Sequence, residues 1–107
     1  MEEKFVIKAL AALAQHNRLQ IFRTLVVNGR EGLTPALLAQ ALLLPANTLS
    51  FHLKELMNAE LISQERSGRN LIYRAQFDRM NAVLSFLTLN CCQGEICIAE
   101  PSSQFKC

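Results

Sequence analysis

The sequence lacks the features that identify membrane and secreted proteins. No apolar run approaches the roughly 20 residues of a membrane-spanning helix, and the opening Met-Glu-Glu-Lys shows no secretory signal pattern. The formal net charge is only +2, so any basic surface for nucleic acid would have to come from the local placement of arginine and lysine. These absences predict a cytoplasmic protein.

Patterns typical of enzymes are missing as well. The sequence shows no paired carboxylates, no nucleophile with an accompanying base and no glycine-rich loop that could cradle a phosphate. Internal repeats and low-complexity tracts are also absent. We therefore expect a protein that is not an enzyme and that carries no prosthetic group.

Apolar residues, in contrast, are abundant. Half of the 107 residues are hydrophobic and 19% are charged. Folding a single domain of this length buries roughly 60 to 65% of the surface of the unfolded chain. The apolar fraction exceeds what such a small monomer can hide, so part of the apolar surface is expected to form a subunit interface.

Apolar residues at helical spacing predict four helices in the first part of the chain. The first spans Glu3 to Ala14, and the second, which His16-Asn17 can cap, ends at Asn28-Gly29. Thr34-Pro35 then places a capping hydroxyl before a proline at the first helical position and so predicts a third, short helix. A fourth is expected over about residues 46–58, after a short turn, and the last two together form a helix-turn-helix.

The remaining chain predicts a hairpin and a last helix. The extended runs Leu61–Glu65 and Leu71–Arg74 flank the segment Arg66-Ser67-Gly68-Arg69-Asn70, whose central glycine favours a tight turn. From Phe77 to about Cys92, apolar residues cover more than one stripe of the predicted helix. This helix is therefore expected to pack both on its own core and on a second chain.

This order of elements is that of a winged helix-turn-helix, a mainly α fold with a small β-hairpin. Residues 12–22 (ALAQHNRLQIF), 47–56 (NTLSFHLKEL) and 68–73 (GRNLIY) resemble the ArsR/SmtB family of metal-responsive bacterial repressors, and the resemblance extends from Ala9 to about Leu89. It implies a homodimer, joined through the first and last helices, that binds double-stranded operator DNA. Residues 1–92 would form the DNA-binding and dimerisation domain, and residues 93–107 a cysteine-containing tail.

Two segments supply candidate contacts to DNA. In the second helix of the helix-turn-helix, asparagine, serine and threonine can hydrogen-bond base edges or phosphates, a phenylalanine can touch a thymine methyl, and a lysine suits a phosphate. The hairpin arginines can meet the phosphate backbone or the minor groove. An ordinary polar helix face and a solvated hairpin tip are the alternatives. The candidates are Asn47, Thr48, Ser50, Phe51, Lys54, Arg66 and Arg69.

Three positions within these segments need separate treatment. His52 falls beside the apolar face, where a hydrogen-bonded structural histidine is favoured over a ligand or a pH switch. Many relatives carry a basic residue where this chain has Phe51 and a polar cap where it has Pro45. The base preference of the family therefore does not carry over to this chain.

Three cysteines, Cys91, Cys92 and Cys97, lie within seven residues. Thiolates are soft ligands, so their grouping indicates either capture of a thiol-seeking ion or reversible oxidation. In a reducing compartment, clustered cysteines are more often metal-binding or redox-active than structural disulfides. Unreactive thiols in a flexible tail are the third alternative.

The resemblance narrows the choice of ligand. Residues 36–44 contain no cysteine and residues 77–89 no histidine, so the sites of other arsenic and zinc sensors of the family are missing. The segment 90–97 resembles that of a subset of arsenic repressors with a trap at the end of the last helix. Gly94 could end the helix and let Cys97 turn back toward the adjacent pair.

Three converging thiolates suit trivalent arsenic or antimony, whereas tetrahedral zinc would need a fourth ligand. Cys107 is treated as incidental. The sequence therefore predicts a homodimeric repressor that is released from operator DNA when As(III) or Sb(III) binds Cys91, Cys92 and Cys97. A thiol redox sensor of the same fold is the alternative, and a metal-binding protein or enzyme with no DNA target is a third possibility, of which the enzyme is disfavoured by the missing catalytic patterns.

Overall fold

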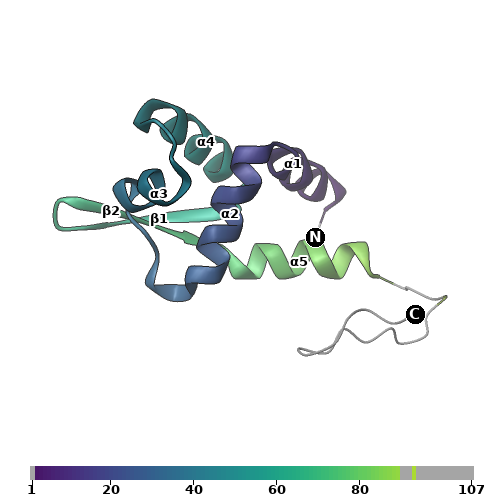
Figure 1. Ribbon diagram of the computed structural model, residues 1–107. Helices are drawn as coiled ribbons and strands as arrows, with labels where there is room; N and C mark the ends of the chain where they lie inside the picture. Colours follow the sequence, from purple (N-terminus) through teal and green to yellow (C-terminus); the bar gives the residue numbers. More distant parts are fainter. Residues whose placement is uncertain (1, 90–92, 94–107) are drawn as a thin grey trace.

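The computed structural model describes residues 2–89 and residue 93. Figure 1 shows helices at both ends of this segment and a hairpin that projects to one side. The mainly α fold with a small antiparallel hairpin confirms the expected fold class. The elements are α1 (Glu3–Leu13), α2 (His16–Asn28), the 3₁₀ turn η1 (Gly29–Glu31), α3 (Pro35–Leu42), α4 (Ala46–Asn58), β1 (Ile62–Ser67), β2 (Asn70–Ala75) and α5 (Phe77–Leu87).

Helix α2 lies at the centre of the fold and touches α1, α3, α4 and β2. Its residues Ile21 and Leu25 are completely buried. Around them pack Leu38 from α3 and Leu56 from α4, which are equally buried, so a single apolar core joins the helices to the base of the hairpin. Burying each such side chain contributes about 1.5–3 kcal/mol.

Helices α3 and α4 form the helix-turn-helix, and they are bent by 111° relative to one another. The predicted start signal is confirmed, because the Thr34 hydroxyl accepts a hydrogen bond from the amide of Leu37 at 3.3 Å and Pro35 is the first helical residue. Leu43 ends α3 in a left-handed conformation with φ of 55°. This conformation turns the chain tightly into α4.

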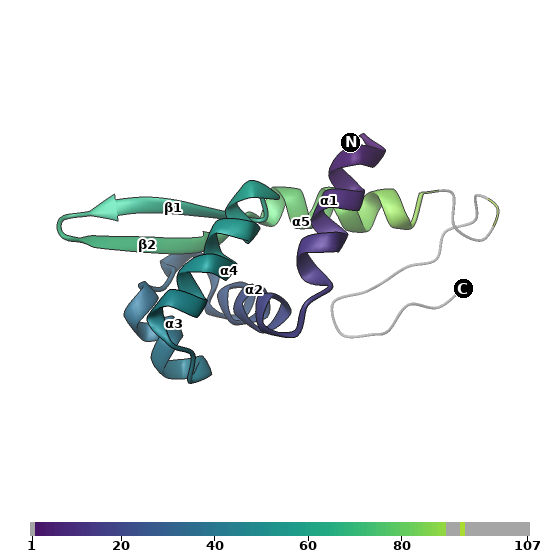
Figure 2. The ribbon, with the colours of Figure 1, turned by 90° about the horizontal axis from the view of Figure 1, so that it is seen from above.

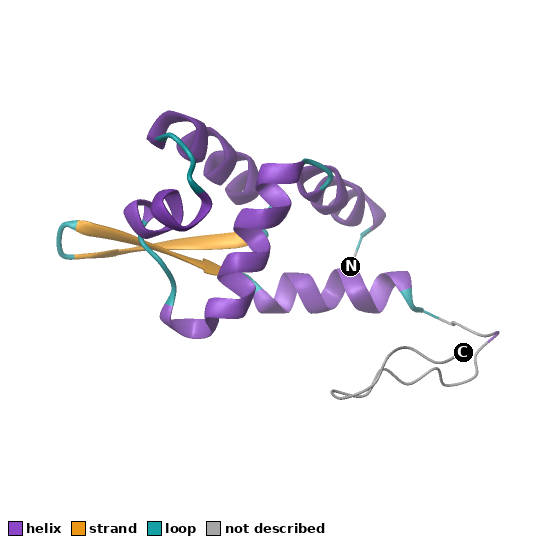
Figure 3. Ribbon diagram, in the orientation of Figure 1, coloured by secondary structure: helices purple, strands orange, loops and turns teal. Residues whose placement is uncertain are grey.

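Strands β1 and β2 form the wing, which is drawn in orange in Figure 3. They pair antiparallel from Ile62 with Ala75 to Ser67 with Asn70, so the turn contains only Gly68 and Arg69. Gly68 has a φ of 63° and Arg69 does not have a positive φ, which is the pattern of a type II′ turn. The wing is therefore a regular hairpin with a glycine where its turn requires one.

Several predicted boundaries are wrong. The cap of α2 is Gln15, whose side-chain oxygen accepts from the amide of Arg18 at 2.9 Å, and not His16-Asn17, which lie inside the helix. Both strands are longer than predicted. Helix α5 ends at Leu87 and not near Cys92, and the Thr88 hydroxyl donates to the carbonyl oxygen of Leu84 at its end.

The wing lies at one end of the described part of the molecule, and α1 and α5 lie together at the other end, as Figure 2 shows from above. Between them stands the helix-turn-helix, with α3 and α4 on the side of the wing. Within the described part of the chain, no single helix combines the length and apolar character needed to cross a membrane, although the bent α3–α4 pair meets both criteria together. The predicted domain boundary at residue 92 lies outside the described residues.

Candidate nucleic-acid interface

The exposed face of α4 carries four of the five helix residues that were predicted to contact DNA. Asn47, Ser50, Phe51 and Lys54 are all exposed and follow one another at spacings of three, one and three residues, which places them on one stripe of the helix. Thr48 is only half-buried and lies at the edge of that stripe. Leu49, Leu53 and Leu56 hold the opposite face in the core.

The first turn of α4 has free amide groups, because its cap residue Pro45 provides no side-chain hydrogen bond. The Asn47 side-chain oxygen accepts from one of these, the amide of Thr48, at 2.9 Å. The amino group of the same side chain remains as a donor. Asn47 is thus prepared to donate to a base acceptor or a phosphate oxygen at the start of the helix.

His52 is the buried counterpart of this stripe and is only 6% exposed. Its Nδ1 lies 3.4 Å from Nη1 of Arg18 on α2, and Arg18 Nε donates to the carbonyl oxygen of Ala12 at 2.7 Å. Burial lowers the pKa of His52 below its usual value, the nearby Arg18 charge lowers it further, and Glu55 opposes the shift. The prediction of a hydrogen-bonded structural histidine agrees with this geometry.

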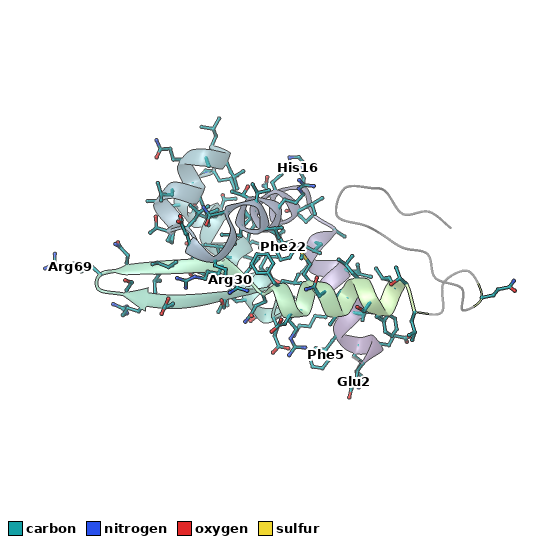
Figure 4. The ribbon with its side chains drawn as sticks, turned by 90° about the horizontal axis from the view of Figure 1, so that it is seen from below. Glu2, Phe5, His16, Phe22, Arg30 and Arg69 are labelled. Atoms are coloured by element: carbon teal, nitrogen blue, oxygen red, sulfur yellow. The ribbon has the colours of Figure 1, made fainter. Side chains whose placement is uncertain are left out.

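The wing presents its arginines to solvent. Arg66 and Arg69 are exposed, and neither forms an ion pair within residues 2–89. Figure 4 shows Arg69 at the outer tip of the hairpin, pointing away from the body of the protein. Arginines so placed can reach phosphates beside the groove that α4 would enter.

Arg74 has a different role from the two outer arginines. Its Nη1 lies 2.7 Å from a carboxylate oxygen of Glu65 across the hairpin, and its Nε donates to the carbonyl oxygen of Arg30 at 2.7 Å. These bonds tie the wing to η1. Because Glu65 pairs with Arg74, the negative charge of Glu65 is partly neutralised and offsets less of the positive charge of Arg66 and Arg69.

A cavity of about 340 Å³ lies between α4 and the wing. Ser50 and Lys54 line it from the helix, and Gln64 lines it from β1. These side chains can donate three kinds of hydrogen bond toward one strand of DNA: from a hydroxyl, an ammonium and an amide. The exposed stripe of α4 and the wing therefore border the same cavity, to which both contribute polar side chains.

A second surface, at the other end of the molecule, is apolar. A groove of about 360 Å³ runs between α1, α2 and α5. Leu10, Leu19, Leu84 and Leu87 line it and are 40 to 55% exposed. Beside it, the Arg79 guanidinium carbon lies 5.1 Å from the centre of the Phe5 ring, which links α5 to α1.

The predicted cysteine site cannot be placed in this geometry. Cys91, Cys92 and Cys97 lie outside the described residues, as do Gly94 and Cys107. Within residues 2–89 and 93, no group of three histidine, cysteine or acidic residues could hold a metal ion.

Sequence reasoning did not single out Arg18 or Gln15, although both bind the elements that support α4. Arg18 joins the α1–α2 corner to His52, and Gln15 caps α2. Both lie in the stretch 12–22 that carries the family resemblance, which is the only signal that pointed to them. The spacing of apolar residues does not distinguish an arginine that is hydrogen-bonded within the fold, as Arg18 is, from one that is exposed to solvent.

Known proteins share both the motif and the fold. The model of a helix-turn-helix domain family matches residues 13–65. An ArsR-like transcriptional regulator from Rhodococcus sp. RHA1 is 26% identical, with a TM-score of 0.70 over 78% of this chain and 76% of that one. HlyU from Vibrio cholerae is 27% identical, with a TM-score of 0.67 over 87% of this chain and 100% of that one.

A third similar structure is a homodimeric winged helix-turn-helix DNA-binding domain from Mycobacterium bovis. It is 25% identical, with a TM-score of 0.65 over 86% of this chain and 85% of that one. No curated protein matches the sequence. The domain match, the wing and the polar stripe on α4 agree: the chain is a winged helix-turn-helix transcriptional regulator similar to the ArsR and HlyU proteins, a class whose members bind DNA and are not enzymes.

Proposed function

We propose that the chain is a homodimeric repressor that binds an operator in double-stranded DNA and leaves it when As(III) or Sb(III) binds Cys91, Cys92 and Cys97. The DNA-binding part of the proposal rests on the exposed stripe of α4 and on the exposed wing residues Arg66 and Arg69, which form no ion pair within residues 2–89. A helix of this kind fits the major groove, and the wing reaches the adjacent backbone.

The apolar groove between α1, α2 and α5 supports the dimer. Its exposed leucines would be covered by the same groove of a second copy, as a two-fold symmetric interface requires. The similar domain from Mycobacterium bovis is homodimeric. A two-fold dimer places two recognition helices in successive major grooves, about 34 Å apart, on a near-palindromic site.

The donor chemistry supports the effector. Three thiolates are soft ligands that match a trivalent metalloid. Cys91 follows the last residue of α5, Leu87, by four positions, and Leu87 lines the dimer groove. An ion held at this point would act on the helix that sets the spacing of the two recognition helices. A coupling of about 1–3 kcal/mol changes operator affinity from several-fold to about a hundredfold.

One titration tests this proposal. Duplexes selected from a randomised library by the full chain would be bound under reducing conditions and titrated with As(III), Sb(III), Zn(II) and Cd(II), with fluorescence anisotropy as the readout. We expect selective release by As(III) and Sb(III). Cys91→Ser, Cys92→Ser and Cys97→Ser should each bind DNA as the wild type does but resist release, and the matched control Cys107→Ser should behave as the wild type.

A redox sensor is the second candidate, because the same cysteines can form a disulfide. A structure of reduced HlyU from Vibrio cholerae is also similar to this chain, at 25% identity. Under this alternative, release would follow an oxidant and disappear in reductant, and As(III) would have no effect on reduced protein. Normal release of Cys97→Ser by As(III), with loss of release in Cys107→Ser, would mean that the third ligand is assigned wrongly.

A further inference from the structure

Phe51 is unusual among the residues of α4. It is 56% exposed, and it is the only large apolar side chain of that helix that faces solvent. Its neighbours on the stripe, Asn47, Ser50 and Lys54, are all polar. Single exposed apolar side chains are common on protein surfaces, so the significance of Phe51 comes from its position among the polar residues that are predicted to contact DNA.

The Phe51 ring contacts a buried side chain of the same helix. The ring meets that of His52 edge to face, with centroids 5.4 Å apart and planes at 63°. His52 is itself buried and lies against Arg18, whose Nε donates to the carbonyl oxygen of Ala12. This series of contacts connects the α1–α2 corner to the exposed ring.

The chemistry of the major groove limits what such a ring can recognise. A phenyl ring has no hydrogen-bonding group, and the only apolar group on the base edges of the major groove is the C5-methyl of thymine. We propose that Phe51 determines specificity by contacting a thymine methyl in each half-site, and that His52 is the positioning residue that holds the ring. This inference rests on the proposed binding of operator DNA, and it names the group that one residue reads.

Replacement of thymine by deoxyuridine tests the contact, because it removes the methyl and leaves every hydrogen-bonding group in place. Duplexes selected by the full-length wild type would be resynthesised with each thymine replaced in turn, and affinities measured at one salt concentration. We expect one position in each half-site at which the wild type loses about fourfold in affinity, the effect of one buried methyl-sized group.

Variants assign the effect to the ring. Phe51→Ala should bind thymine and deoxyuridine duplexes equally at that position, whereas Phe51→Leu should keep part of the difference. Lys54→Ala is the matched control, because it removes a phosphate contact from the same stripe: it should weaken both duplexes and keep the fourfold ratio. Phe51→Ala in the protein and deoxyuridine in the DNA form a double-mutant cycle, which separates the contact between the ring and the methyl from a general loss of affinity.

The role of His52 is tested by the same ratio. His52→Asn should lower the ratio of the affinity for the thymine duplex to that for the deoxyuridine duplex toward one, although Phe51 is still present. Arg18→Lys keeps the positive charge but loses the planar set of guanidinium donors, and it should lower the same ratio. Circular dichroism would show whether each variant is folded. If His52→Asn is unfolded, the result for Arg18→Lys decides: an unchanged ratio would remove the positioning role.

The outcomes are distinct. If wild-type protein binds selected duplexes but no thymine responds to methyl removal, or if Phe51→Ala keeps the difference, the assignment of Phe51 is overturned and DNA binding stands. If no duplex is enriched at all, the proposed function fails first, and the assignment of Phe51 fails with it.

Discussion

His52 is the one polar residue that is buried within the described part of the chain. Its ring faces a guanidinium, which can only donate, so this contact favours a neutral imidazole that accepts at Nδ1. A proton on Nδ1 would remove the acceptor and place two positive charges side by side. The sequence predicted a structural histidine here, but not its partner, because Arg18 is 34 residues distant in the chain.

This arrangement predicts a pH dependence of stability. The pKa of His52 is lowered in the folded protein, first by burial and then by Arg18, so the unfolded chain binds more protons as the pH falls through about 6.5. The free energy of unfolding should therefore be highest above that pH and decrease below it. Urea unfolding of wild type between about pH 8 and pH 5 measures this decrease.

Two asparagine variants separate His52 from other titrating groups. His52→Asn should lose stability at neutral pH but show a shallower decrease on acidification than wild type. His16→Asn, at an exposed position on α2, is the matched control and should follow the wild-type curve. Equal pH dependence in wild type and His52→Asn would mean that the Arg18–His52 contact does not govern stability.

At the scale of single residues, the sequence predicted those positions whose role is local. Thr34 caps α3 and Gly29 ends α2 because capping and left-handed geometry depend on neighbours in the chain. The exposure of the α4 stripe also followed from periodicity. Arg18 and Gln15 were missed, because their partners are set by tertiary contacts or by a choice between adjacent capping residues.

Between elements, Gly32 controls how the helix-turn-helix sits on the wing. The amide and carbonyl of the next residue, Leu33, pair with Tyr73 of β2 at 2.9 and 2.8 Å. A Cβ added at Gly32 would lie 2.5 Å from Ile72 Cγ2 and 2.8 Å from the Tyr73 carbonyl oxygen. The backbone of β2 therefore leaves no space for a side chain at this junction.

The two glycines before α3 give a matched pair of substitutions. Gly29 and Gly32 have φ of 83° and 77°, so alanine at either position should cost about 1–3 kcal/mol in backbone strain. Only Gly32→Ala also collides with β2, and it should lose about 1–3 kcal/mol more, since nothing lies within 4 Å of a Cβ at Gly29. Urea denaturation measures both losses. If the losses are equal, the wing must be able to shift away at little cost.

The elements themselves were predicted well in type and order, and less well in length. All four predicted helices before the wing are present, and α4 has the predicted bounds, 46–58. The strands extend to Ser67 and Asn70 because pairing across a two-residue turn continues to its edge, whatever the polarity of Arg66 and Ser67. Helix α5 was predicted too long, because the apolar pattern continues beyond Leu87, where the helix ends.

At the scale of the whole molecule, the exposed leucines of α1 and α5 form a surface that a second copy of the chain can cover. The composition predicted an apolar surface too large for a monomer, and the structure places Leu84 and Leu87 in the groove with half of their surface exposed. The sequence could not specify the shape of this groove, because α2 also lines it through Leu19 and Val26. Three elements that are separated in the chain thus form one surface.

A charge placed in that groove should separate the dimer without unfolding the subunit. Leu87 is 55% exposed in the single chain, so the carboxylate of Leu87→Glu can stay in water when the chain is alone, but it would be buried unpaired between two copies. We expect wild type to sediment at about twice the chain mass of 12.0 kDa and Leu87→Glu at the monomer mass. Operator affinity should fall steeply in the variant, since one recognition helix reads only half of the site.

Val27→Glu is the matched control for this change. Val27 is 76% exposed on α2 and does not line the groove, so the same carboxylate there should leave both the mass and the operator affinity unchanged. Sedimentation equilibrium at micromolar concentration measures the mass, and circular dichroism confirms that each variant keeps its helices. A wild type that remains monomeric yet binds its selected duplex tightly would show that the groove has another purpose and that one subunit is enough for DNA binding.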